Sequence, residues 1–157
     1  PLTVMESFTA KILSSGSFQM DQAAYLSTLC QSPSEKINLW VEQNILNQDF
    51  DVNVERNQRG LMMVPTTDSV TGASFHLGEA LVNESLVKVD GTPGYAMKLG
   101  KNLEDSLSVA ILDAVIQSGK FHEEISSFLQ ELDADLKSQM EKEMKQIETT
   151  RVNMQTF

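Results

Sequence analysis

The chain has 157 residues, of which 41% are hydrophobic and 22% charged, and its formal net charge at pH 7 is −10. That length and composition fit one domain with a real core. The acidic excess argues against nucleic acid as a main partner and against an anionic membrane surface, because both attract clustered Lys and Arg. No apolar run approaches the ~18 residues that span a bilayer, so a cytoplasmic protein is expected.

The first third of the chain is expected to be helical. Apolar residues recur at helical spacing over residues 5–13 and again over residues 21–31. A third helix should begin after Ser32, where Ser32 can cap the helix and Glu35 can complete a capping box. These segments form the N-terminal helical part of the predicted domain.

The middle of the chain changes to the period of β-strands. Asn57 to Gly60 and Asp90 to Gly94 have the composition of turns, and Gly78 suggests a bulge. Because the apolar segments between such signals are joined by short connections, the sheet should be antiparallel. The expected strands are residues 51–55, 61–64, 74–77, 80–89 and 95–99.

The last third is expected to form two helices. Asn102 can cap the first helix, whose apolar face ends before Gly119. Apolar residues then recur every three or four positions from Phe121 to Ile147, which predicts one long helix. The expected fold class is α+β: an antiparallel β-meander of about four or five strands with N-terminal helices and two C-terminal helices, the last one long. The whole chain, 1–157, is expected to be one domain with a helical part (1–50), a sheet (51–100) and C-terminal helices (101–157).

One strand-to-helix junction resembles a phosphate-binding loop. Gly100, Lys101 and Asn102 follow a strand and open a helix, but the spacing from Gly94 has one residue too many, and Asn102 stands where Ser or Thr would hold magnesium. A true P-loop is therefore rejected. The first helical amides with Lys101 remain candidates for binding an anion. The alternative is a tight turn, a solvated lysine and a cap.

A metal site or a reactive thiol is not expected. His76 and His122 lie far apart in the sequence, and a zinc site needs three or four ligands at suitable spacing. Cys30 is the single cysteine and ends an apolar stretch, so it is expected to be a buried, inert thiol.

Four carboxylates are candidates for paired acid and base: Glu79, Glu84, Asp90 and Asp113. The sequence alone does not show that any two of them converge. Asp113 lies on a polar stripe of its helix, so a solvated or interface carboxylate is expected there.

The final helix is a candidate interface. A helix this long on a small domain cannot bury its whole apolar side internally, and methionines suit adaptable partner surfaces. The alternative is that this side packs on the chain's own N-terminal helices. The candidate interface residues are Met140, Met144, Ile147, Arg151 and Met154.

Several segments, in this order and spacing, resemble the PhnG family of the carbon–phosphorus lyase system from about residue 55 to the end. Each motif is weak alone, and the ordered set is fairly specific. The segments are Gly60–Val64 with Asp68–Gly72, Phe75–Val82, Asp90–Tyr95 with Gly100–Lys101, Ala110–Ala114, Leu132–Asp135 and Thr150–Met154.

The resemblance implies a cytoplasmic subunit of a transferase assembly with PhnI-, PhnH- and PhnJ-like partners. Such an assembly uses ATP as a substrate, displaces adenine with an alkylphosphonate and forms an α-D-ribose 1-alkylphosphonate 5-triphosphate. The family's nucleosidase-like chemistry is placed on the PhnI subunit, so this chain is expected to support catalysis without catalytic residues or a cofactor of its own.

Two departures from the family pattern and two alternatives accompany the resemblance. The family usually has Gly-Arg-Asp where this chain has Gly100-Lys101-Asn102, and a lysine lacks the planar fork that holds phosphate at two points. The family favours Val-Asp-Phe-Phe where this chain has Val152 to Gln155. One alternative function is a small stand-alone transferase that binds a nucleotide at Gly100–Asn102. The other is a ligand-free homodimeric interaction protein.

Overall fold

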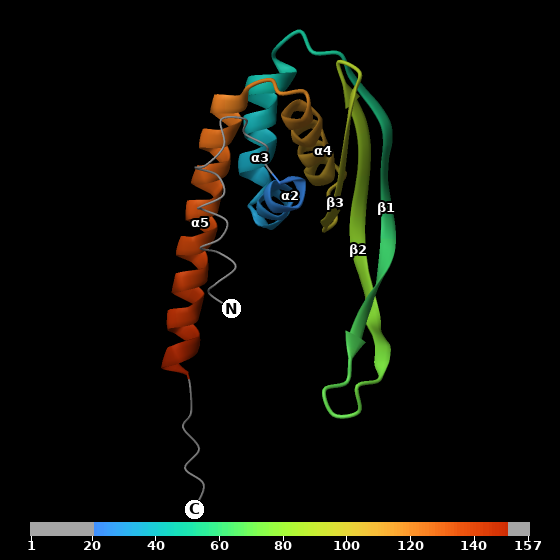
Figure 1. Cartoon of the computed structure of the whole chain (residues 1–157), viewed down its shortest axis with the longest axis vertical. Helices are drawn as coiled ribbons and strands as arrows, with labels where there is room; N and C mark the ends of the chain where they lie inside the picture. Colours follow the sequence, from blue (N-terminus) through green and yellow to red (C-terminus); the bar gives the residue numbers. More distant parts are fainter. Residues whose placement is uncertain (1–20, 151–157) are drawn as a thin grey trace, which may run out of the picture.

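The computed structural model describes residues 21–150 (Figure 1). A three-stranded sheet lies at one side, and helices fill the space between it and a long C-terminal helix. The helix expected over residues 5–13 lies outside the described residues. The elements are α2 (Gln22–Gln31), α3 (Ser34–Val41), the π-helical turn η1 (Glu42–Leu46), β1 (Val52–Thr67), β2 (Ser74–Val89), β3 (Thr92–Leu99), α4 (Leu103–Gln117) and α5 (His122–Thr149).

The sheet is antiparallel, as predicted, with strand order β1-β2-β3. The prediction of four or five strands was wrong, because β1 and β2 are 16 residues each and run through the expected breaks. Gly60 lies inside β1, opposite Val82, so pairing with β2 overrides the local turn composition. The expected bulge is confirmed near Gly78, where the β1–β2 register shifts.

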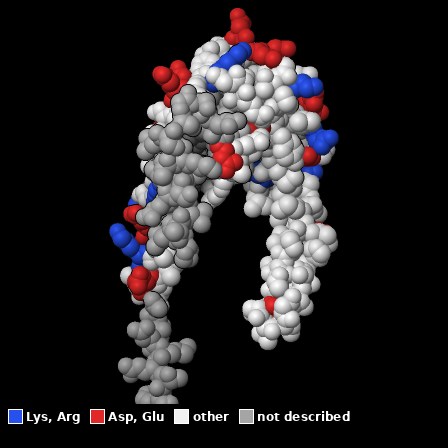
Figure 2. Space-filling view, in the orientation of Figure 1, with Lys and Arg blue, Asp and Glu red and all other residues white. Residues whose placement is uncertain are grey.

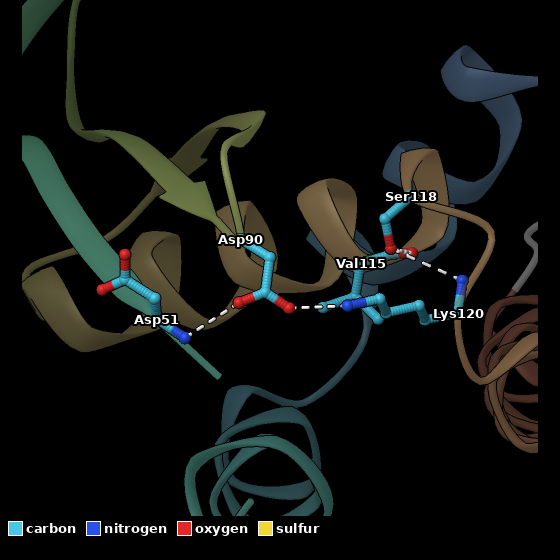
Figure 3. Close-up of polar contacts among 5 residues, drawn as sticks. All are labelled: Asp51, Asp90, Val115, Ser118 and Lys120. Atoms are coloured by element: carbon cyan, nitrogen blue, oxygen red, sulfur yellow. Dashed lines mark hydrogen bonds and ion pairs between the residues drawn. The ribbon is translucent and has the colours of Figure 1, made fainter. Parts of the chain in front are cut away.

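The β2–β3 turn is made by Asp90 and Gly91, whose φ angles of 49° and 81° are both in the left-handed region that two-residue hairpins require. The Asp90 carboxylate accepts from the backbone N–H of Asp51 at 3.0 Å and from Lys120 Nζ at 2.6 Å (Figure 3). Lys120 follows α4 in the chain, and Asp51 precedes β1. The turn therefore ties the end of the sheet to the α4–α5 connection.

The α2–α3 junction differs from the predicted capping box. Pro33, not Ser32, occupies the N-cap position of α3, and within the described residues it has no side-chain cap bond. Ser32 ends α2 instead, and its hydroxyl donates to the Thr28 carbonyl at 2.7 Å. Since a C-terminal carbonyl of α2 lies within reach, the hydroxyl serves the preceding helix and not the following one.

The helix α4 is the centre of the fold. One side of α4 lies against a face of the sheet, and α2 and α3 lie on the side of α4 away from the sheet (Figure 1). Its close approach to β3 depends on Gly94. A Cβ atom added at Gly94 would lie 2.1 Å from the carbonyl oxygen of Ala110 and 2.7 Å from the Cβ of Ala114. Only a glycine permits this helix-to-strand distance.

The last helix, α5, packs on α2 and α3 through its first half. Ile125 and Leu132 are almost fully buried, and the ring of Trp40 stacks on Phe128 with centroids 5.0 Å apart. The apolar spacing that predicted this helix is therefore confirmed, as is that of Ile37 in α3, which is fully buried. In the part of the chain between residues 21 and 150, no helix is long and apolar enough to span a bilayer.

Two arms extend from this body in the same direction (Figures 1 and 2). The hairpin arm is residues 60–81, the part of β1 and β2 beyond the end of β3, with the loop that joins them. The helix arm is residues 136–149 of α5, beyond the buried Leu132. Both arms continue elements whose other halves form the core.

Candidate functional site

The predicted anion-binding residues lie together at the start of α4. Gly100 has a φ of 138° and its N–H donates to the Leu81 carbonyl at 3.2 Å, so it turns the chain away from the sheet. Asn102 is the N-cap residue as predicted, although its side chain makes no cap hydrogen bond within residues 21–150. Lys101 is exposed. The sequence therefore predicted the placement of these three residues.

The surroundings of this turn are polar but not basic. Asn83 is fully buried beneath it and donates from Nδ2 to the carbonyls of Gly100 and Asn102, each at 3.0 Å. The first turn of α4 holds Glu104 and Asp105. These carboxylates occupy the positive end of the helix dipole, which lowers the affinity expected for a second anion there.

The expectation that Asp113 is solvated or at an interface was wrong, because the side chain is fully buried. Its Oδ1 accepts from Tyr25 Oη at 2.5 Å and from Gln22 Nε2 at 3.1 Å. Its Oδ2 accepts from the Tyr95 N–H and from Gln117 Nε2, both at 2.9 Å. Burial and the adjacent carboxylate raise the pKa of Tyr25 well above its ordinary value, so the tyrosine stays a donor. Asp113 thus joins α2, α4 and β3.

The other three carboxylates lie in separate surroundings and do not form an acid–base pair. Glu84 lies on the outer face of the sheet, where hydrogen bonds from Gln58 and Arg56 lower its pKa. The hydrogen bond from Lys120 lowers the pKa of Asp90, which lies in the turn after β2. Both groups therefore hold their charge at neutral pH and do not suit a general acid. Glu79 lies in the hairpin arm.

No metal site was expected, and among the described residues no group of three His, Cys, Asp or Glu side chains could hold an ion. Cys30 is half-buried, and burial raises the pKa of its thiol, which makes it less reactive.

A buried lysine was not anticipated from the sequence. Lys98 is 7% exposed, and its Nζ donates to the carbonyl oxygens of Leu29 (3.4 Å) and Ser32 (3.1 Å) at the end of α2. Burial lowers its pKa. A cation at a helix C-terminus is favourable because it complements the negative end of the helix dipole. Lys98 therefore holds α2 against β3. Its burial could have been anticipated from its position in β3, where buried and exposed residues alternate.

Apolar side chains remain uncovered on the helix arm. Met140, Met144 and Ile147 are 55%, 63% and 64% exposed, so this part of α5 does not pack on the described residues of its own chain. Of the other candidate interface residues, Arg151 and Met154 lie outside the described residues.

The hairpin arm carries a larger apolar surface, which the sequence predictions did not identify. Its exposed residues are Leu61, Met62, Met63, Val70, Phe75, Leu77 and Leu81. The signal in the sequence was the absence of any Lys or Arg between Arg59 and Lys88. An exposed apolar surface of this extent is typical of a protein–protein contact.

Among residues 21–150 no group of His, Cys, Asp and Glu side chains could hold a metal ion, while both arms expose apolar side chains. The model of the PhnG family, described as phosphonate metabolism protein PhnG, matches residues 21–157. This match spans the whole sheet, the central helix and both arms. The chain therefore belongs to the PhnG family of phosphonate metabolism proteins.

Proposed function

We propose that this chain is a supporting subunit of a carbon–phosphorus lyase assembly. In this role it contributes to the formation of an α-D-ribose 1-alkylphosphonate 5-triphosphate from ATP and an alkylphosphonate, with release of adenine. The family match over residues 21–157 is the observation that carries the proposal. The assembly acts as a transferase in the cytoplasm, and ATP is its substrate, not a cofactor of this chain.

The absence of a built reaction centre in residues 21–150 favours a supporting role. Asp113 is occupied by four donors, and Glu84 and Asp90 are each held by a cation. A general acid needs a proton that it can donate to a substrate, and a general base needs a lone pair that is free to accept one. In this proposal the reactive groups belong to a PhnI-like subunit, with PhnH- and PhnJ-like chains as further partners.

Reconstitution tests this function. PhnG-, PhnH-, PhnI- and PhnL-like chains are mixed with ATP and methylphosphonate, and adenine release is followed by chromatography. We expect adenine release to require this chain and to disappear when it is left out. Release at the same rate without it, or by this chain alone, would contradict the proposed role.

A further inference from the structure

The core-facing sides of β2 and α5 continue past the end of the core. On β2, Ser85 and Val87 are fully buried under α4, and Leu81 on the same face is 38% exposed. Its partner across the hairpin, Leu61, is 64% exposed. On α5, the spacing that buries Leu132 leads to the exposed side chains of the helix arm. Leu61, Leu81 and the exposed apolar residues of the helix arm therefore extend the two sides of the core beyond the helices that fill it.

The hairpin arm also has a free backbone edge. The strand β3 pairs with β2 only from Val82 to Val89, so residues 74–81 of β2 have no strand on that side within the described part of the chain. The last bond there runs from the N–H of Gly100 to the carbonyl of Leu81. Since alternate residues of a strand direct their N–H and C=O groups to the same neighbour, those of Glu79 point to this open edge. An extended chain can therefore continue the line of β3.

The charges on the hairpin arm favour a different protein over a second copy. Asp68 and Glu79 are the ionised side chains of the hairpin arm, whereas the helix arm carries three Lys and three Glu and has no formal net charge. Two hairpin arms in contact would bring like charges together, whereas Lys and Arg on a partner would be attracted to the hairpin arm.

We propose that the arms hold one segment of a different polypeptide, which adds a strand to β2 along residues 74–81 and packs apolar side chains against both arms. The segment is apolar in its middle and carries Lys or Arg at its ends. This inference rests on the proposed function, since it assigns the surface that joins this chain to its assembly. In Figure 2 the arms stand apart with few charged side chains on the hairpin.

We call this arrangement, in which both arms hold one partner segment, the clasp. Pull-down from cells that co-express the PhnH-, PhnI- and PhnJ-like chains tests it, with the tag on this chain. Leu61→Asp on the hairpin arm and Met144→Asp on the helix arm should each weaken capture of one partner at least about 30-fold, as expected for central interface residues. Leu39→Asp is the matched control, because Leu39 is 54% exposed on α3 and lies outside both arms. It should leave capture unchanged.

The contribution of the strand edge is tested at Glu79. Glu79→Pro removes the N–H that points to the open edge and leaves the bonds to β1 in place, so it should weaken capture as much as the aspartate variants. Glu79→Ala removes the carboxylate and keeps the N–H, so it should still bind. Circular dichroism shows whether each variant is folded. In the complex of the unmodified chain, the Glu79 amide should exchange with deuterium at least about tenfold more slowly than in the isolated chain.

The possible outcomes separate this inference from the proposed function. Capture of partners by the unmodified chain and equally by both arm variants overturns the clasp and leaves the function standing. Failure of the unmodified chain to capture any of the three partners overturns both. A dimer of this chain that Leu61→Asp dissociates identifies a second copy as the occupant and overturns the proposal. Slow exchange of the Glu79 amide already in the isolated chain shows that the chain's own residues cover the edge, which also overturns it.

Discussion

Replacing Asp113 by Asn should destabilise the fold far more than its isosteric shape suggests. Each carboxylate oxygen accepts two hydrogen bonds, from Tyr25 and Gln22 on one side and from the Tyr95 N–H and Gln117 on the other. Whichever oxygen becomes an amide NH₂ then faces two donors. The two glutamines can turn toward water, but the tyrosine hydroxyl or the backbone N–H stays buried without an acceptor.

The size of the effect follows from these contacts. Loss of the net hydrogen-bond energy and burial of one unpaired donor together cost about 3 kcal/mol. Tyr25→Phe removes a single donor and leaves Asp113 three, so it should cost about 1–2 kcal/mol. For a urea dependence of about 2 kcal/mol per M, Asp113→Asn moves the unfolding midpoint down by about 1.5 M.

Urea unfolding followed by the fluorescence of Trp40 is the assay. Trp40 is the chain's single tryptophan and stacks on Phe128 of α5, so its emission reports the packing of α3 on α5. Asp49→Asn, at an exposed position before β1, is the matched control and should leave the midpoint almost unchanged. A loss for Asp113→Asn no larger than that for Tyr25→Phe would refute the account of a carboxylate that satisfies four donors.

Three further predictions concern packing, pH and ligand binding. Gly94→Ala places a Cβ against the carbonyl of Ala110, so it should cost about 3 kcal/mol in the same unfolding assay. The hydrogen bond from Lys120 lowers the folded-state pKa of Asp90, so Asp90 adds stability above the ordinary aspartate pKa of about 3.9 and loses it as the pH falls further. Thermal unfolding should therefore separate Asp90→Asn from the unmodified chain at pH 7, and the difference should shrink below pH 4. If the turn before α4 binds an anion, Lys101→Ala should abolish ATP binding measured by calorimetry.

Each of these has an outcome that contradicts it. Gly78→Ala is the packing control, since an added Cβ at Gly78 meets no atom within 4 Å, and an equal loss at both glycines would rule out close packing as the cause. An Asp90→Asn difference that persists at pH 2 would show that charge is not involved. Unchanged or absent ATP binding in both proteins would remove the anion site at Lys101.

The sequence predicted the elements whose signals are local. The helices α2, α4 and α5 follow from apolar spacing, and the turn at Asp90 and Gly91 follows from its composition. The same local reasoning divided β1 at Gly60, because the pairing of Gly60 with Val82 depends on a strand far along the chain. Local signals therefore placed the elements but not the length of the hairpin.

The site could be predicted only in part, for a similar reason. The apolar stripe of α5 predicted a helix face that the domain does not bury, and Met144 is 63% exposed in the part of the chain that the structure describes. The burial of Asp113 was not predicted, because its donors Gln22 and Tyr25 lie 91 and 88 residues away in the sequence. A polar stripe on one helix cannot show whether a neighbouring helix supplies matching donors. The role of the arms as an interface stays a prediction.

The edge of β2 that no strand of residues 21–150 covers has a consequence for how the protein is made. A two-stranded ribbon with bare backbone groups and few charges is a template onto which unrelated extended chains can add, which is the first step of aggregation. Charged residues that normally guard such edges are few between Arg59 and Lys88. Synthesis of this chain alone should therefore give a lower yield of soluble protein than its synthesis together with a partner that covers the edge.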